Sequence, residues 1–557
     1  MSDFIDEIET LTSKPPEVCG EQMDEGLLHE SARERAKQQP LLQRISKSLT
    51  KNSKTYREII VSEECAETRL AILCNGIMEE FATDSLSQAN WVGAIFKGRI
   101  QNLEDGLKAA FVIIGQEKNA FLHYWDMLPA ANESFEIISH GTQKVKITLD
   151  DIPRMYPIGS EVPVQIIKSQ IGSKGPRVTT NIALPGRYLV LTPYDDRLGI
   201  SRKIEKPKER ERLKRILEKM VIPEGMGIVI RTAGAEKKIK FFVRDLSILL
   251  KKWHGIAQRI SSAQEPCMVY QEPGLIGRAV RDFLTDDVDR IVTDSAQLRG
   301  EIVEKIAEIA PRMQSKVFLY EEKPPIFEYF HVEKQIQRLF SRRLPLASGG
   351  EIVFEETEAL TAVDVNTGSH KFAKEANKNL ILQVNLEAAQ EIARQIYLRN
   401  LGGLIIIDFI DMKSASDQRR VYDEMQTLMA NDTARFQILP ISALGIMQIT
   451  RQRHSQSFTR RMRTCCPYCN GRGSIQSIPT TAMNIRRAIV RTICQRQRAE
   501  DKVEKITIKV LLHSDVLEFL KEHHSEELEE LERKNDISLA FAGDKNIHRE
   551  SFRLLHH

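Results

Sequence analysis

Two aspartates and an asparagine stand near the ends of two apolar segments of the chain. Asp364 and Asn366 lie in ALTAVDVN, and Asp408 follows three isoleucines in GLIIIDFIDM. Side chains alternate along a strand, so Asp364 and Asn366 would point the same way. Neighbouring carboxylates repel each other unless a cation lies between them, and Mg²⁺ is the usual cation beside phosphates. These residues are candidate metal ligands, although a single such aspartate more often caps a turn or a helix.

The segments around these residues predict how they are positioned. Residues 340–450 read as strand, long helix, strand and helix. In a βαβα run of this kind the two strands are parallel neighbours joined by a right-handed crossover. Asp364 and Asp408 would then lie about 5 Å apart at the carboxyl edge of the sheet, where open α/β sheets bind ligands.

Three of the eight cysteines stand together and indicate a metal site rather than disulfides. Cys466 and Cys469 form a C-x₂-C pair that precedes a Gly-Arg-Gly turn, and Cys465 directly before them has no assigned role. A structural zinc needs four ligands, and the chain has no second C-x₂-C. Two chains that each donate a pair to one shared zinc would complete the site, which predicts a dimer. The alternatives are a redox pair or two unrelated cysteines.

Short strands in residues 91–181 predict a small barrel. Five of them with one long connection are typical of an OB-type barrel. Phe111 and Phe121 fall on different strands, with Lys97 and Arg99 on a third. Exposed aromatic side chains with flanking cations on such a barrel stack unpaired bases and neutralise phosphates. By alternation alone, Phe111 fits the core equally well.

Composition limits the class of protein. The 557 residues include 80 Lys and Arg against 77 Asp and Glu, a net charge of +3, and 41% are hydrophobic. This balance excludes a histone-like polycation, and the apolar fraction excludes global disorder. We find no apolar run near the about 20 residues of a membrane helix and no secretory signal, so we expect a cytoplasmic protein. Residues 1–56, acidic and then basic, are expected to form a flexible tail or a lone helix.

Four motifs together resemble those of a known family. EALTAVDVNTG, NLEAAQEIARQ, LGGLIIIDFIDM and CPYCNGRG, in this order and spacing, resemble the ribonuclease E/ribonuclease G family over roughly residues 57–557. The long disordered carboxyl-terminal scaffold of the E type is absent, so the chain is more similar to the short ribonuclease G type.

The resemblance implies a multidomain α/β and α+β fold. An OB-fold barrel of the S1 type would be inserted in an RNase H-like domain, with a DNase I-like α/β catalytic domain, a zinc link and a small C-terminal domain after it. The implied boundaries are 1–56 for the tail, 57–90 and 277–339 for the discontinuous RNase H-like domain, 91–181 for the S1-type RNA-binding domain, 182–276 for a 5′-phosphate sensor region, 340–462 for the catalytic domain, 463–475 for the zinc link and 476–557 for the C-terminal domain.

The resemblance also implies roles for single residues. In the family, the aspartates matching Asp364 and Asp408 hold Mg²⁺, and the residue matching Asn366 supports that site. Zn²⁺ would be shared between two chains through Cys466 and Cys469 of each. The RNA-contacting positions of the family match Phe111, Phe121, Lys168 and Lys174.

Arg231 and Thr232 are a weaker signal when read from the residues alone. They end an apolar strand and precede Ala-Gly, and an Arg fork beside a hydroxyl on a tight turn suits a terminal phosphate. An ordinary surface arginine remains the more frequent explanation of such a pattern. In the family this pair, with the positions matching Gly186, Val190 and Arg435, forms a pocket for the 5′-monophosphate of RNA.

The expected function is Mg²⁺-dependent endonucleolytic hydrolysis of single-stranded RNA to 5′-phosphate and 3′-hydroxyl ends, in rRNA maturation and mRNA decay. Attack by the RNA 2′-hydroxyl would need an acid and a base such as two histidines, and only His370 and His454 lie near the motifs. The expected partners are RNA and a second copy of the chain, with a tetramer left open. The alternatives are a non-catalytic RNA-binding scaffold, against which the intact Asp364, Asn366 and Asp408 argue, and an axial-filament-type structural protein.

Overall fold

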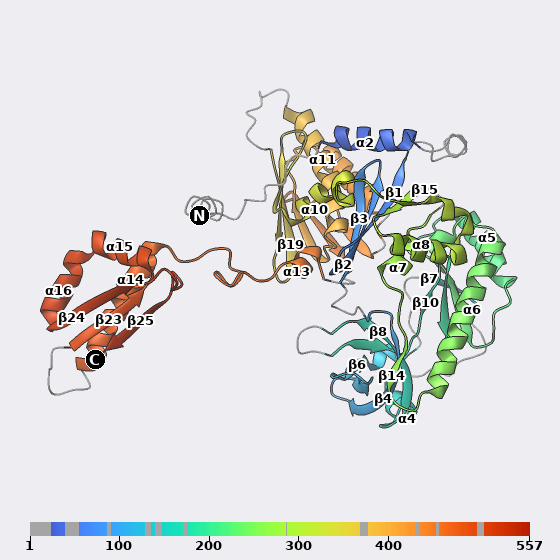
Figure 1. Ribbon diagram of the computed structural model, residues 1–557, viewed down its shortest axis with the longest axis horizontal. Coiled ribbons are helices and arrows are strands. Elements are labelled where there is room, and N and C mark those ends of the chain that lie inside the picture. Colours follow the sequence, from blue (N-terminus) through green and yellow to red (C-terminus); the bar gives the residue numbers. More distant parts are fainter. Residues whose placement is uncertain are drawn as a thin grey trace. The chain divides into compact units, whose positions relative to one another are not determined.

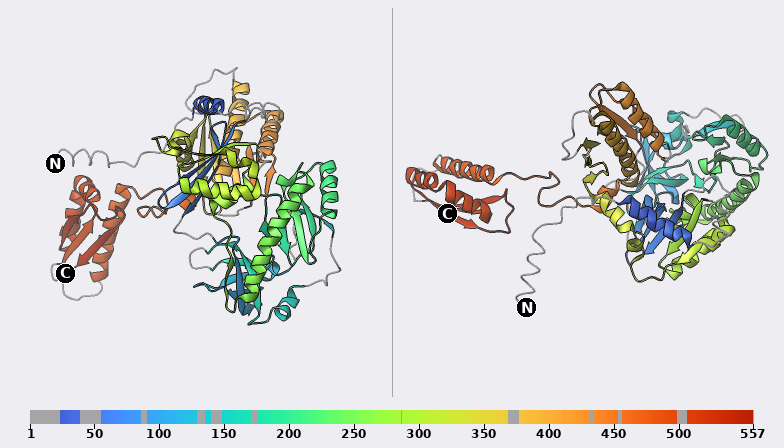
Figure 2. Two further views of the ribbon diagram at one scale, coloured as in Figure 1. Left: turned by 45° about the vertical axis from the view of Figure 1, so that its right-hand side comes forward. Right: turned by 90° about the horizontal axis from the view of Figure 1, so that it is seen from above.

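The computed structural model describes residues 24–38, 55–85, 91–128, 135–139, 148–170, 175–285, 287–367, 377–430, 432, 434–452, 456–497 and 506–556. They fall into two compact units, Met1–Thr459 and Arg460–His557. The elements of each unit can be followed in Figures 1 and 2. None of the helices in these ranges is long and apolar enough to cross a membrane.

The first sheet combines two distant stretches of the chain. Its order is β16-β15-β1-β2-β3, with β15 parallel to β1 and β2 antiparallel to β1 and β3. Because side chains alternate along β1, Ile59 and Val61 pack with α7 and α8 while Ile60 packs with α9 and α10. The bounds are β1 Arg57–Glu63, β2 Glu67–Cys74, β3 Ile77–Ser85, β15 Val288–Thr293, β16 Val317–Leu319, α7 Leu275–Asp282, α8 Ala296–Ile309, α9 Ile326–Tyr329 and α10 Val332–Phe340.

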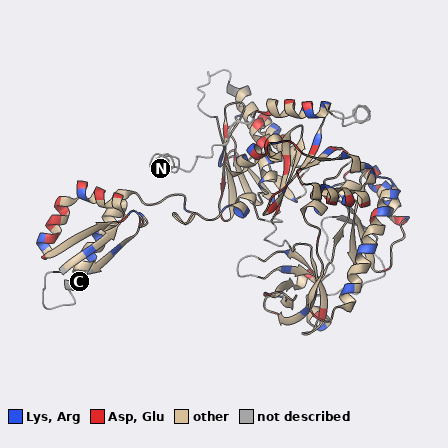
Figure 3. Ribbon diagram, viewed as in Figure 1, with Lys and Arg blue, Asp and Glu red and all other residues tan. Residues whose placement is uncertain are grey.

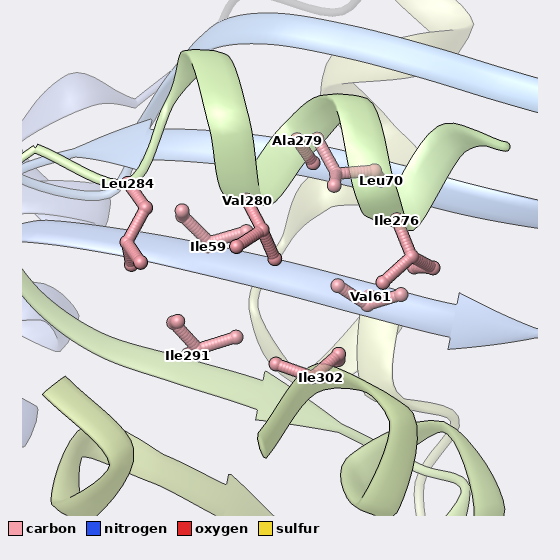
Figure 4. Close-up of a pocket in the computed structure, with 9 residues that line it drawn as sticks. All are labelled: Ile59, Val61, Leu70, Ile276, Ala279, Val280, Leu284, Ile291 and Ile302. Atoms are coloured by element: carbon pink, nitrogen blue, oxygen red, sulfur yellow. The ribbon is translucent and has the colours of Figure 1, made fainter. Parts of the chain in front are cut away.

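A small pocket lies between α7 and this sheet (Figure 4). The nine side chains that line it are all aliphatic, so it offers a ligand no hydrogen-bonding group. Binding sites combine apolar walls with a few polar groups. We therefore regard this pocket as part of the hydrophobic core.

Residues 25–37, within the segment expected to be a flexible tail or a lone helix, are helical. They form α2 (Glu25–Lys37), which begins after the capping Asp24 and buries Leu28 and Ala32. Arg35 donates to Glu58 of β1 over 2.9 Å, and their side chains are only 4% and 0% exposed. The charge pattern of residues 1–56 cannot reveal this ion pair, because Glu58 lies outside that segment, on β1.

The second sheet closes on itself. The strands follow the order β14-β4-β5-β6-β9-β8, and β4 also pairs with β8, so that β4, β5, β6, β9 and β8 form a closed barrel. This confirms the five-stranded, OB-like barrel predicted from the sequence. The bounds are β4 Ile95–Glu104, β5 Ala109–Ile113, β6 Ala120–His123, α4 Ile152–Met155, β8 Glu161–Lys168, β9 Arg177–Thr179 and β14 Cys267–Tyr270.

A third sheet, β10-β11-β13-β12-β7, packs against two helices rich in Lys and Arg, α5 and α6 (Figure 3). Its edge strand β7 comes from the long connection within the barrel segment and pairs with β12. In exchange, β14, which follows α6, pairs with barrel strand β4. The bounds are β7 Phe135–Ser139, β10 Leu184–Pro185, β11 Leu189–Pro193, β12 Leu198–Ser201, β13 Met226–Ile230, α5 Pro207–Glu218 and α6 Ile239–Ser262.

The fourth sheet carries the candidate metal ligands. Its order is β17-β18-β19-β20-β22-β21, and β19 and β20 are parallel neighbours, as the βαβα pattern predicts. Val363 and Val365 of β19 and Ile405 and Ile407 of β20 pack with α11 and α12 in one core. The bounds are β17 Arg343–Pro345, β18 Glu351–Glu356, β19 Leu360–Asn366, α11 Asn377–Leu398, β20 Gly403–Asp408, α12 Ala415–Met429, β21 Phe436–Leu439 and β22 Ile446–Arg451.

The second unit is a small α/β fold. Its sheet has the order β24-β23-β25, with β23 parallel to β24 and antiparallel to β25. Ile508 and Val510 of β23 pack with Ile485 and Ile489 of α14. The bounds are α14 Ile478–Gln497, β23 Ile506–Leu512, α15 Ser514–His523, α16 Ser525–Asn535, β24 Ile537–Gly543 and β25 Phe552–His556, and α13 Phe458–Met462 spans the boundary between the units.

Replacement of Arg35 by alanine should destabilise the first unit. The change removes the hydrogen-bonded cation of the buried Glu58 carboxylate and leaves only Arg290, 3.5 Å away, so the cost should be at the lower end of that for a broken buried pair, about 3 kcal/mol. Unfolding in urea measures the loss. Arg33→Ala, on the exposed side of the same helix, should stay within about 0.5 kcal/mol of the unchanged protein. Equal stability of both variants would show that the ion pair does not anchor α2.

Candidate functional site

The two strand-end aspartates lie side by side. Asp364 of β19 and Asp408 of β20 are partners in the parallel register, and both side chains are exposed. Asn366 Nδ2 donates to Asp364 Oδ2 over 2.7 Å. The residues that the alternation pattern places at one edge of the sheet therefore meet there, while their role stays a prediction.

The local electrostatics of this pair suit a cation. Partial burial, and then the charges of Asp364 and Asp411, raise the pKa of Asp408 above its ordinary value. A cation between the carboxylates would favour their charged forms. Within the described ranges no three His, Cys, Asp or Glu residues gather into a metal-binding group. Two carboxylates with room for waters and substrate phosphates are the usual protein contribution to an Mg²⁺ site.

The loop after Asp408 is held by a residue that the sequence analysis missed. Asn385 is fully buried in α11, where its Nδ2 donates to Ile410 O over 2.9 Å and its Oδ1 accepts from Ile410 N over 3.1 Å. A buried amide that satisfies both groups of one backbone residue fixes that backbone. An asparagine on the apolar face of NLEAAQEIARQ is the signal that could have revealed it.

Aromatic side chains line the outer face of the barrel. Phe111 of β5 and Phe121 of β6 are register partners whose ring centroids lie 5.9 Å apart, and both are half-buried. Phe111 is therefore not a core residue. His123 adds a third ring, 6.4 Å from Phe121, which the sequence analysis missed. Partly exposed rings of this kind can stack on unpaired bases.

The cations near this face differ in how far their side chains are exposed. Lys168 is exposed at the end of β8 and is in register with Arg177, itself the register partner of Phe121. The expectation for Lys97 is wrong, because its side chain is buried and its Nζ donates to Ala263 O over 2.6 Å and pairs with Glu161 over 2.7 Å. Lys174, His370 and His454 lie outside the described residues.

The candidate phosphate-binding residues gather around the end of β13. Arg231 Nη1 donates to Gly186 O over 2.6 Å, and Thr232 Oγ1 lies 3.3 Å from Ser201 Oγ at the end of β12. Val190 of β11 is in register with Val229, one residue before this end. Arg435 is exposed directly before β21, and Lys203 Nζ, two residues after β12, donates to the backbone oxygen of Asp432 in the same segment.

Gly186 fits this region because it has no side chain. A Cβ atom there would lie 2.7 Å from Asp245 Oδ2, closer than real Cβ contacts come. Asp245 cannot move away easily, because it accepts from the backbone nitrogens of Arg187, Tyr188 and Leu189 at 3.2, 2.8 and 2.9 Å. Its own burial raises its pKa despite these bonds.

The cysteine pair lies at the start of the second unit. Cys466 is exposed and Cys469 half-buried, and Gly473 N donates to Cys469 Sγ over 3.4 Å. Backbone hydrogen bonds from Cys469 and Tyr468 hold the pKa of Cys466 below its usual value. A thiolate is the form that binds zinc, so these contacts suit a ligand. The part of the chain that the structure describes adds no third ligand beside them.

Replacement of Gly186 by alanine should destabilise the third sheet. The added methyl group would be forced against the fixed carboxylate of Asp245, and overpacking of this kind costs about 1–3 kcal/mol. Urea unfolding of the full chain measures it. In Gly255→Ala, within α6, the added Cβ meets nothing within 4 Å, so a gain of about 0.5–1 kcal/mol is expected. If Gly186→Ala leaves the free energy of unfolding unchanged, the side chain of Asp245 can move away from the added methyl group.

Comparison with known proteins adds independent evidence. Residues 183–454 match the model of the Ribonuclease E/G family, and residues 465–557 match the RNase E/G, thioredoxin-like domain. Ribonuclease G of Escherichia coli (strain K12) is 38% identical over 435 residues, which cover 78% of this chain and 87% of that protein. Ribonuclease G of Haemophilus influenzae is 34% identical with the same coverage. Ribonuclease E of Escherichia coli (strain K12) is 37% identical over 437 residues, 78% of this chain and 40% of that protein. Identity at this level over most of a relative's length shows that the chain belongs to the ribonuclease E/G family.

Proposed function

We propose that this endoribonuclease hydrolyses single-stranded RNA with an Mg²⁺ ion held by Asp364 and Asp408. The observation that carries the proposal is the register of the two parallel strands, which brings the carboxylates together at an exposed edge. The names of the relatives, Ribonuclease G and Ribonuclease E, support RNA as the substrate.

Different residues would bind the metal ion and orient the carboxylates that hold it. Bound Mg²⁺ would polarise the scissile phosphate and lower the pKa of an attacking water, which leaves 5′-phosphate and 3′-hydroxyl ends. Asp364 is oriented by the amide of Asn366, and Asp408 by the strand register and by the loop that Asn385 holds. Because these carboxylates are already in place, little reorganisation is needed when substrate binds.

The barrel face would bind the RNA strand and the third sheet its 5′ end. Bases would stack on Phe111 and Phe121, while Lys168 and Lys174 neutralise phosphates. Arg231 and Thr232, with Gly186, Val190 and Arg435, would bind a 5′-monophosphate, because an Arg fork and a hydroxyl are suitable donors for its oxygens.

Assembly and cellular role are further parts of the proposal. Cys466 and Cys469 of two chains would share one Zn²⁺ and link a homodimer, with pairing of dimers into a tetramer left open. We assign the first sheet to an RNase H-like domain, the barrel to the S1 type and the fourth sheet to a DNase I-like domain. The proposed processes are rRNA maturation and mRNA decay in the cytoplasm.

Asp364→Asn and Asp408→Asn should each abolish cleavage while RNA affinity changes only a few-fold. A metal-bound phosphate gains several kcal/mol of charge stabilisation, so loss of a ligand should lower the rate by at least about 100-fold. Cleavage of an AU-rich, 5′-monophosphorylated oligonucleotide with Mg²⁺ or with EDTA measures this, and filter binding measures affinity. Asp423→Asn, an exposed aspartate of α12, is the control. Cleavage retained in both variants would refute the metal assignment, and binding without cleavage by the unchanged protein would favour the scaffold alternative.

Metal content and oligomeric state should change together. Two thiolates per chain complete a tetrahedral site only across two chains, so the purified protein should carry about half a zinc per chain and sediment as at least a dimer. The double variant Cys466→Ser, Cys469→Ser should lose the zinc and shift towards monomer. Cys494→Ser, an exposed cysteine of α14, should change neither quantity. One zinc per chain in a monomer would mean that Cys465 or a distant histidine completes the site.

A further inference from the structure

We propose that Asp282, the last residue of α7, is a positioning residue that presents Arg231 to the 5′-phosphate of the RNA. The inference rests on the proposed phosphate pocket and deepens it, because it names the residue that determines which edge of the guanidinium is available. Asp282 comes from a helix that packs on the first sheet, 51 residues further along the chain than Arg231.

The hydrogen bonds of Arg231 are concentrated on one nitrogen. Its Nη1 donates to Gly186 O over 2.6 Å and to Asp282 Oδ1 over 2.7 Å. These two bonds use both hydrogens of Nη1. Among the described residues none accepts from Nε or Nη2 of Arg231. The Nε–Nη2 edge, which can bind an anion with two parallel hydrogen bonds, is therefore left for the phosphate.

Asp282 can act in this way because it is itself held. Arg281 donates to Asp282 Oδ2 from Nη2 over 3.0 Å, and Arg281 Nη1 pairs with Glu272 on its other side. Arg281 Nε also lies 3.3 Å from Oδ1, the oxygen that accepts from Arg231, so Arg281 holds the whole carboxylate in place beside Arg231. Burial alone would raise the pKa of Asp282, but the hydrogen bond from Arg281 and the charges of Arg231 and Arg281 outweigh it and hold that pKa below its usual value. The carboxylate stays charged at neutral pH.

The opposite role, a competitor that occupies Arg231 until RNA displaces it, fits these contacts less well. A competing carboxylate would take the Nε–Nη2 edge, where a phosphate would bind, whereas Asp282 contacts Nη1 alone. A planar guanidinium bonded at Nη1 to two fixed oxygens has a defined plane, so its other edge is preorganised. The two roles predict opposite effects when Asp282 is removed.

The test compares one AU-rich oligonucleotide with a 5′-monophosphate and with a 5′-hydroxyl, cleaved by the full chain with Mg²⁺. The unchanged protein should cut the phosphorylated form faster, and Arg231→Ala should erase this preference. Asp282→Ala should raise KM for the phosphorylated RNA by about tenfold, as expected for a lost hydrogen bond to a charged group, with a much smaller change in kcat. The 5′-hydroxyl form gives the reference rate of each variant.

Two further variants distinguish a positioning role of Asp282 from an effect of the substitution on folding. Asp282→Asn keeps the shape and one acceptor, so the rise in KM should be smaller, about threefold. Arg278→Ala breaks a different ion pair of α7, with Asp84 at 3.6 Å, and should keep the full preference. Thermal unfolding checks that each variant is folded. If Asp282→Ala folds poorly, Asp282→Asn decides, and an unchanged KM in it overturns the proposal.

The remaining outcomes distinguish the inference from the pocket on which it rests. No preference in the unchanged protein would overturn the pocket and the role of Asp282 together. A preference lost in Arg231→Ala but kept in Asp282→Ala would overturn only the role of Asp282. A lower KM in Asp282→Ala would show that Asp282 competes with the phosphate.

Discussion

The register between β19 and β20 is the constraint on which the candidate active site depends. Five residues of each strand pair in parallel, from Leu360 with Leu404 to Asp364 with Asp408. Because side chains alternate, a slip of β20 by one residue would turn Asp408 into the core and both Ile405 and Ile407 out of it. The apolar residues that pack with α11 and α12 therefore fix the polar ones as well. The stability of this core and the geometry of the site have the same cause.

The features that could be predicted from the sequence are those carried by local patterns. Alternation and the length of the crossover segment predict the parallel pair and the meeting of Asp364 with Asp408, and short strands between turns predict the closed barrel. The faces of single residues were harder to predict. Which face of β5 is covered depends on the closure of the whole barrel, so alternation alone cannot place Phe111, which is half-buried beside Phe121. Lys97 is unavailable because Ala263, 166 residues away, accepts from it.

Charged pairs between distant segments are a second kind of feature that the sequence could not reveal. Arg35 with Glu58 and Arg231 with Asp282 each join residues from different elements, and neither pair lies in a recognisable motif. A net charge of only +3 fits this arrangement, because many cations already have acidic partners within the fold. Attraction of a polyanion must then come from the cations that remain exposed, such as Lys168.

The exchange of strands between the barrel and the third sheet has a consequence for substrates. β7 leaves the barrel segment to pair with β12, and β14 crosses back to pair with β4, so hydrogen-bonded ladders tie the two sheets together in both directions. Two surfaces joined in this way resist sliding or hinging against each other. An RNA that stacks on the barrel while its end lies near β13 would span a set distance. On the proposed roles of these two surfaces, the separation between the stacking face and the phosphate pocket would be the same for every substrate.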